Sequence, residues 1–215
     1  MMEVFSKKTI KNLFIYTFFF VLIFASVYFI KDNAKKQNEV KETIQILFKD
    51  WNNQDMESIY KVSGEKESFQ YSTGFEDNVV ITEIMEKHIY EGPEYQLQDL
   101  EIEGIGKKDA KASATIDLTT YNNLEVLDTV INQLLNDNSK ITKDYEHEDF
   151  VKSNEDGILE ATKDIKKSSQ KTLIIYLECK DNKWSIPYSH NKDFYDALTG
   201  GMITFTESVN TDVEL

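Results

Sequence analysis

The hydropathy pattern begins with one long apolar run, from Leu13 to Ile30, that contains no charge, no glycine and no proline. Eighteen helical residues at 1.5 Å each extend about 27 Å, close to the ~30 Å hydrocarbon core of a bilayer. The run is apolar on all sides and lysines flank both of its ends, which favours a membrane span over a buried core helix. We therefore predict that residues 13–30 anchor the chain in a membrane.

The anchor could be a cleaved export signal or a retained span. Signal peptides have an apolar region of ~7–15 residues that ends in a small-x-small cleavage site. This run is longer and ends in the bulky residues Val27 to Ile30, so we predict retention. Three lysines precede the run and three follow it, which leaves the positive-inside count nearly tied. Because short leading tails usually stay in the cytosol, we expect residues 1–12 inside the cell and the rest of the chain outside the cytoplasm.

The next segments have helical spacing. Residues 31–38 are polar but lack glycine and proline, so they are predicted to continue the span as a helical stalk. Apolar positions from Val40 to Trp51 then recur on one helix face. Two further helices are expected, from Met56 to Val62 with Asn53 or Asp55 as the cap, and from Asp77 to the Gly92-Pro93 pair.

Strict alternation predicts strands further along the chain. Ala110 to Thr119 alternate apolar and polar side chains with period two, and residues 95–105 form the strand before them. In the earlier strand the apolar residues change from odd to even positions near Gln98 to Leu100, and this parity flip predicts a bulge. Residues 106–109 are the expected hairpin turn, and a short strand is also expected over 67–72.

The pattern in the last third of the sequence predicts two helices followed by a second β-hairpin. Helical patterns over 124–134 and 154–167, with Ile158, Leu159 and Ile165 inward, indicate a helical hairpin inserted at about 123–168. Residues 172–180 are apolar on both parities, which is typical of a strand covered on both faces. A turn at 181–183, a strand at 184–186 and a helix at 192–198 follow, and residues 203–215 are expected to be a frayed tail. The class is therefore α+β, with one domain over 39–202.

Charge and cysteine content exclude several functions. From Gln37 onward the chain has 18 basic and 36 acidic residues, a formal charge of −18, so nucleic acid is a poor partner. All 24 basic residues are lysines, so the chain lacks the bidentate fork of arginine for phosphates and carboxylates. Cys179 is the only cysteine, which excludes an intrachain disulfide and a cysteine-based metal site.

Two segments carry a resemblance to known proteins. The element order resembles the nuclear-transport-factor-2-like (cystatin-like) superfamily, in which a curved sheet wraps helices into a cone. The segments LFKDWNNQDMESIYK and LECKDNKWSIPYSHNKDFYDALTGGM look like those of uncharacterised membrane-anchored or lipoprotein-type extracytoplasmic proteins of Gram-positive bacteria. The chain departs from the lipoproteins because no lipid-acceptor cysteine follows the apolar run. The superfamily contains isomerases, dehydratases and binding domains, so the resemblance implies a fold and leaves the function open.

The sequence contains no complete catalytic, cofactor-binding or metal-binding motif. His88 lies on the apolar stripe of its helix, His147 lies in a charged segment typical of a solvated face, and His190 precedes a helix. Because aromatic and apolar side chains line most ligand pockets, we expect five residues around any cavity between the helices and the concave sheet face. They are Tyr60, Met85, His88, Tyr176 and Trp184.

Three functions remain open. The first, which we favour, is a membrane-anchored extracytoplasmic module that binds a protein or a small apolar ligand without catalysis. The second is a small-molecule enzyme of the same fold that uses His88 and a carboxylate. The third is a structural subunit of a cell-envelope complex.

Overall fold

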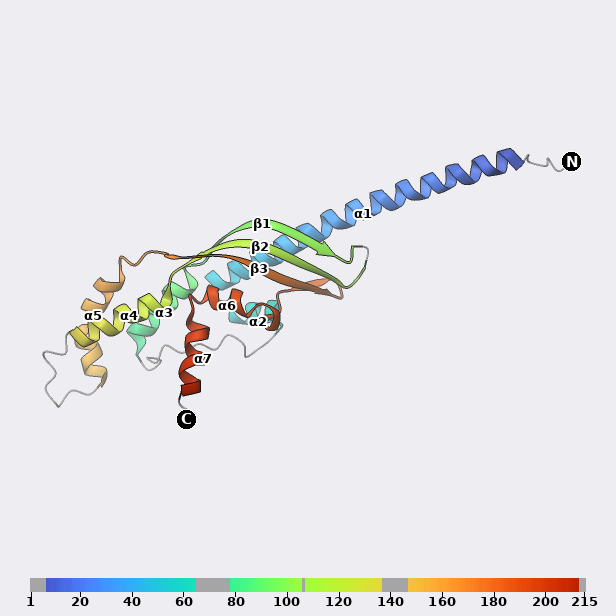
Figure 1. Ribbon diagram of the computed structural model, residues 1–215. Helices are drawn as coiled ribbons and strands as arrows, with labels where there is room; N and C mark the ends of the chain where they lie inside the picture. The colour runs from blue at the N-terminus through green and yellow to red at the C-terminus, as the bar shows by residue number, and fades with distance from the viewer. Residues whose placement is uncertain (1–6, 65–77, 106, 137–146, 213–215) are drawn as a thin grey trace.

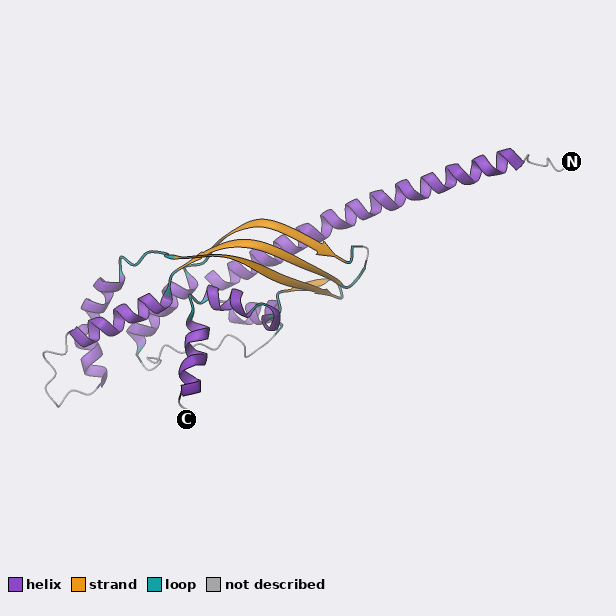
Figure 2. Cartoon of the chain, in the orientation of Figure 1, coloured by secondary structure: helices purple, strands orange, loops and turns teal. Residues whose placement is uncertain are grey.

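A computed structural model describes residues 7–64, 78–105, 107–136 and 147–212 of the chain (Figure 1). These residues form seven α-helices and one four-stranded antiparallel sheet with strand order β1-β2-β3-β4 (Figure 2). The α+β class is confirmed. The strand predicted over 67–72 falls outside the described residues.

Helix α1 (Lys7–Asn52) joins the apolar run to the domain without a break, which confirms that residues 31–38 are helical. Figure 1 shows its first half projecting away from the domain. The described side chains from Tyr16 to Ile30 are exposed, whereas Val40, Ile44 and Trp51 are buried. By length and composition α1 is able to cross a membrane, a property that signal sequences share. One helix is therefore both the candidate anchor and part of the core.

Two capped helices follow. Helix α2 (Met56–Ser63) begins at Asp55, whose carboxylate accepts the Ser58 N–H at 3.1 Å, which settles the choice between the two predicted caps. Helix α3 (Val79–Tyr90) begins at Asn78, whose side-chain oxygen accepts the Ile81 N–H at 3.0 Å. Aspartate and asparagine, which favour the N-cap position, thus cap both helices.

Strands β1 (Glu94–Glu103) and β2 (Ala110–Thr120) form the predicted hairpin. The pairing register shifts between Leu97 and Asp99, so the bulge expected from the parity flip is confirmed. Apolar side chains of β2 face the core at every second position, as the alternation predicted.

Strands β3 (Ser169–Lys180) and β4 (Lys183–Ser185) complete the sheet. The prediction that β3 is covered on both faces is wrong. Ile175 and Leu177 are buried, but Ile174 is 52% and Tyr176 49% exposed. The physical reason is visible in Figures 1 and 2, in which the described helices that contact the strands lie on one side of the sheet. Even-numbered side chains of β3 therefore point to the outer face.

Helices α4 (Asn123–Asn136) and α5 (His147–Thr162) lie between β2 and β3 in the chain and pack against each other, which confirms the helical hairpin. Helix α5 begins seven residues before the predicted start and ends five residues earlier. Ile158 is buried as expected, Ile165 is partly buried after the helix, and Leu159, which was expected to face inward, is 44% exposed.

The C-terminal segment is ordered, so the prediction of a frayed tail over 203–215 is wrong for its described part. After a 3-10 turn (Tyr188–His190) and helix α6 (Lys192–Leu198), the chain forms helix α7 (Met202–Asp212). Met202 and Ile203 are 0% and 4% exposed. Their apolar side chains pack onto the core and hold α7 in place. This packing is a tertiary effect, which the local sequence pattern did not predict.

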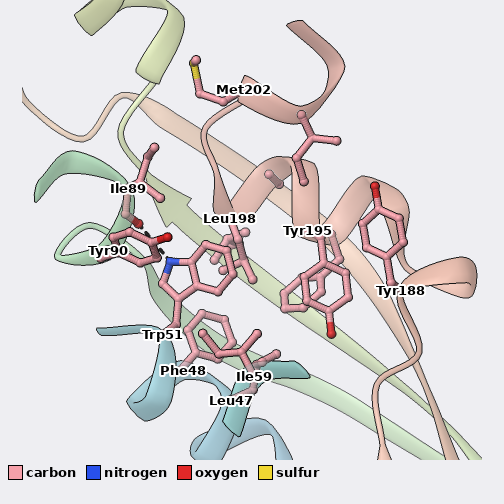
Figure 3. Packing of buried hydrophobic residues seen from close by; sticks show 14 of the residues in the cluster. Leu47, Phe48, Trp51, Ile59, Ile89, Tyr90, Tyr188, Tyr195, Leu198 and Met202 are labelled. Atoms are coloured by element: carbon pink, nitrogen blue, oxygen red, sulfur yellow. Dashed lines mark hydrogen bonds between the residues drawn. The ribbon is translucent and has the colours of Figure 1, made fainter. Parts of the chain in front are cut away.

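The core lies between α1 and the sheet, and Trp51 is its largest fully buried side chain (Figure 3). The Trp51 indole N–H donates to the Ile89 carbonyl at 2.9 Å, and its ring lies 5.6 Å from that of Tyr90. Tyr195 is fully buried and donates to the Ile186 carbonyl at 2.7 Å. Both aromatic groups thus bury apolar area with their polar atoms satisfied.

Candidate functional site

The five residues expected around a concave cavity do not meet at one place. Met85 is fully buried in the core, whereas Tyr176 is half exposed on the outer face of the sheet. Tyr60 packs against the core from α2. Trp184 is partly buried and donates its indole N–H to Glu39 at 3.3 Å. The concave side is filled by core side chains rather than by these five residues around a pocket.

His88 has a structural environment. Its Nδ1 lies 2.7 Å from the Ile84 carbonyl, one turn earlier, and its ring meets that of Tyr121 edge to face at 4.6 Å. No aspartate or glutamate is among the buried polar residues in the described part of the chain. A buried carboxylate within reach of His88, which general acid-base chemistry would need, is thus missing from this region.

The stalk holds one end of the sheet. The ammonium group of Lys36, on α1, donates to the carbonyls of Lys107 at 2.6 Å and Gly104 at 3.3 Å, and Asp32 lies 3.9 Å away. The Lys36 side chain is only 9% exposed, so these contacts offset the cost of burying its charge. We call this end of the sheet, with the β1–β2 turn (104–109) and the β3–β4 turn (181–182), the stalk end.

A cleft of about 600 Å³ opens at the stalk end. Its lining comes from the two turns and the strand ends beside them, and includes Lys107, Lys111 and Lys180 together with Glu103 and Glu178. Charges of both signs therefore line the cleft. Such a lining offers a ligand charged groups of both signs together with apolar area.

A second hollow of about 330 Å³ adjoins this cleft and shares Lys111 and Glu178 with it. Tyr176 and His190 complete its polar and aromatic lining. The pairing of Lys111 with Glu178 across β2 and β3 places both side chains on the outer face. The two hollows together form one groove on the outer face, which we call the outer groove.

Glu178 is the electrostatic centre of the outer groove. Its carboxylate lies 3.2 Å from the Lys180 ammonium and 3.5 Å from Nδ1 of His190, and its side chain is 18% exposed. Among the described residues no group of three or more histidine, cysteine or acidic side chains is arranged to hold a metal ion. The groove therefore combines charged groups with apolar area, part of which comes from Tyr176.

Asn191 positions Tyr176 at the edge of the groove. The Asn191 side chain accepts the Tyr176 N–H at 2.7 Å and donates to the Tyr176 carbonyl at 2.9 Å and to the Pro187 carbonyl at 2.7 Å. It thereby bonds to the edge of β3 as a neighbouring strand would. Asn191 is 3% exposed, so these bonds also satisfy a buried amide.

Sequence reasoning placed Tyr176 among the site residues but missed Lys111, Glu178 and His190. The alternation of β2 did put Lys111 on its polar face, which was a usable signal. His190 and Glu178 lie twelve positions apart, and only the chain reversal through β4 brings them together. His147 begins α5, and its side chain is outside the described part.

The Cys179 thiol should react slowly in the folded protein. Burial raises the pKa of Cys179, and the residue is 4% exposed. A raised pKa leaves less thiolate at a given pH, and the thiolate is the reactive form. At pH 8 we expect modification by a maleimide to be at least ~10-fold slower than in the urea-unfolded chain, measured by mass spectrometry. Equal rates would show that the stalk-end cleft exposes the thiol.

Comparison of the chain with protein-family models, with curated proteins and with solved structures finds no match in any of the three.

Proposed function

We propose that this chain is a membrane-anchored extracytoplasmic interaction module. The observation that carries the proposal is the continuity of α1, whose exposed apolar half leads without a break into a half that forms the core. A helix of this kind transmits the orientation of the anchor to the domain, because no flexible linker separates them. The domain would be presented at a fixed height and angle above the bilayer.

The outer groove is the proposed binding surface, for a protein or a small ligand with apolar and charged groups. Ile174 and Tyr176 expose apolar area beside it, although the other face of β3 is buried. Aromatic side chains are enriched where proteins bind their partners, since one rigid ring contributes both apolar area and a hydrogen bond. Glu178 and Lys111 would fix the orientation of polar groups in the ligand.

We also propose that the domain has the nuclear-transport-factor-2-like architecture. A helical N-terminal part, an antiparallel sheet that arches over α1, and a helical hairpin between β2 and β3 are consistent with it (Figure 2). The contacts of His88 give no support to the enzyme alternative.

Membrane insertion is tested by charge substitution in α1. Val21→Arg combined with Phe24→Arg should make insertion less favourable by about 5–7 kcal/mol, since each arginine at the centre of a span costs ~2.5–3.5 kcal/mol. We expect the wild-type chain in the carbonate-washed membrane pellet and the double variant in the supernatant. The matched control is Asn33→Arg with Asn38→Arg, which adds the same charge to the stalk.

Sidedness is tested by protease treatment of intact cells. Residues 31–212 should be digested from outside, and residues 1–12 should be protected. Recovery of the intact wild-type chain in the soluble fraction would overturn the anchor, whereas protection of the domain in intact cells would overturn its extracytoplasmic position.

A further inference from the structure

We propose that the stalk end of the sheet rests on the membrane surface and binds anionic phospholipid headgroups through its exposed lysines. The inference depends on the proposed function, because it requires that α1 spans a bilayer. It adds a second membrane contact, made by the folded domain itself.

The height of the stalk end follows from α1. Lys36 lies six helical residues beyond Ile30, the last residue of the apolar run, which is about 9 Å along the axis. Its bonds to Gly104 and Lys107 hold the β1–β2 turn at that level. Headgroups extend roughly 5–8 Å beyond the hydrocarbon core on each side. A lysine side chain in the turn therefore reaches the phosphate layer.

Charge is strongly polarised along the domain. Residues 31–36, 104–109 and 180–183, which are the stalk, the two turns and the strand ends beside the second turn, contain seven lysines and three aspartates, a net charge of +4. With Glu103 and Glu178, which line the same cleft, the net charge is +2. The rest of the chain after Ile30 has 14 lysines and 34 acidic residues, a net charge of −20. Lys107, Lys108, Lys180 and Lys183 are exposed. The domain thus directs the exposed lysines of its turns toward the bilayer.

Salt screening determines whether the membrane interacts with the positive stalk end or with the negative remainder of the domain. The Debye length at physiological salt is about 8 Å, so an anionic surface attracts lysines at the stalk end but interacts little with charges far from it. The eleven residues of β2 extend roughly 37 Å from the turn toward the helical hairpin. Most of the acidic charge is therefore beyond effective repulsion. The result is an upright domain, in which the cleft half of the outer groove lies at the bilayer and the half lined by Tyr176 and His190 lies farther from it.

The test uses the full chain in vesicles of neutral phosphatidylcholine, with or without anionic phosphatidylglycerol. A fluorophore is attached at Asp109→Cys in a Cys179→Ser background, and quenching by a headgroup-labelled lipid is measured. The same label at Leu135→Cys, in the helical hairpin, reports the far end. We expect strong quenching at position 109 that increases with anionic lipid and falls with salt, and weak quenching at position 135.

Neutralising Lys107, Lys108 and Lys183 to glutamine should reduce the ratio of docked to undocked domain in anionic vesicles by about fivefold per lysine. The control replaces Lys163, Lys166 and Lys171, exposed lysines distant from the stalk end, and should leave quenching unchanged. Equal effects of the two triple variants, or quenching that is independent of anionic lipid, would overturn the docking. Failure of the labelled chain to float with vesicles of either composition would instead overturn the membrane anchor.

Discussion

The Trp51→Ala variant is expected to lose about 3–5 kcal/mol of unfolding free energy, the usual cost of removing a large aromatic side chain from a core. Trp51 is 1% exposed and lies against α3 and α6, so removing its ring leaves a cavity between these elements. The elements could fill this cavity only by shifting from their present packing. The substitution also leaves the Ile89 carbonyl without its donor, which adds to the loss. Urea unfolding in detergent, followed by Trp184 fluorescence, measures the change.

Two companion variants separate the causes. Trp51→Phe keeps much of the apolar volume but removes the N–H, so it should cost about 1–3 kcal/mol. Ile46→Ala removes apolar atoms from the same helix at a position that is 41% exposed, and should cost under about 1 kcal/mol. A loss of similar size for Ile46→Ala and Trp51→Ala would contradict the placement of Trp51 at the centre of the core.

Elements with a strong local period could be predicted from the sequence. The apolar face from Val40 to Trp51 and the alternation from Ala110 onward each fix their own geometry, and the parity flip near Gln98 located the bulge. Such signals depend on nearby residues alone, so no knowledge of the rest of the fold is needed to interpret them.

The exposed face of β3 could not be predicted in the same way. Ile174 and Ile175 are identical residues, and the structure exposes one and buries the other because the helices cover one side of the sheet. Which side is covered is a tertiary property. The outer groove depends on it, since Tyr176 would be a core residue if both faces were covered.

Helix α7 was missed for a different reason. The helix over 192–198 was expected to stop at Gly200-Gly201 and to be followed by a frayed tail, but the φ values of the pair, +62° and +93°, form a reversal that joins α6 to α7. Beyond the pair, Met202, Ile203 and Phe205 contact the core. A glycine pair is found both in a turn between two helices and at the end of a folded domain. Only the apolar residues after the pair distinguish the two cases.

The reversal at Gly200 leads to the second large effect. A methyl group on Gly200 would lie 2.4 Å from the Tyr121 carbonyl oxygen and 2.8 Å from the Asn123 backbone nitrogen. Both are backbone atoms, of the segment after β2 and of the first residue of α4, and the Asn123 N–H donates to the Gly200 carbonyl at 3.2 Å. Gly200→Ala must therefore displace the start of α4 or open the α6–α7 turn.

We expect Gly200→Ala to lower the unfolding free energy by about 2–5 kcal/mol, from the left-handed conformation and the steric overlap together. Gly64 supplies a matched control, because its φ is +75° and a methyl group there would meet nothing within 4 Å. Gly64→Ala should cost only the conformational term, about 1–2 kcal/mol. The difference between the two variants, measured by urea unfolding with intrinsic tryptophan fluorescence, isolates the contact of the glycine turn with Tyr121 and Asn123. Equal losses would mean that the turn is not packed against α4, and that α7 is held by its own apolar contacts alone.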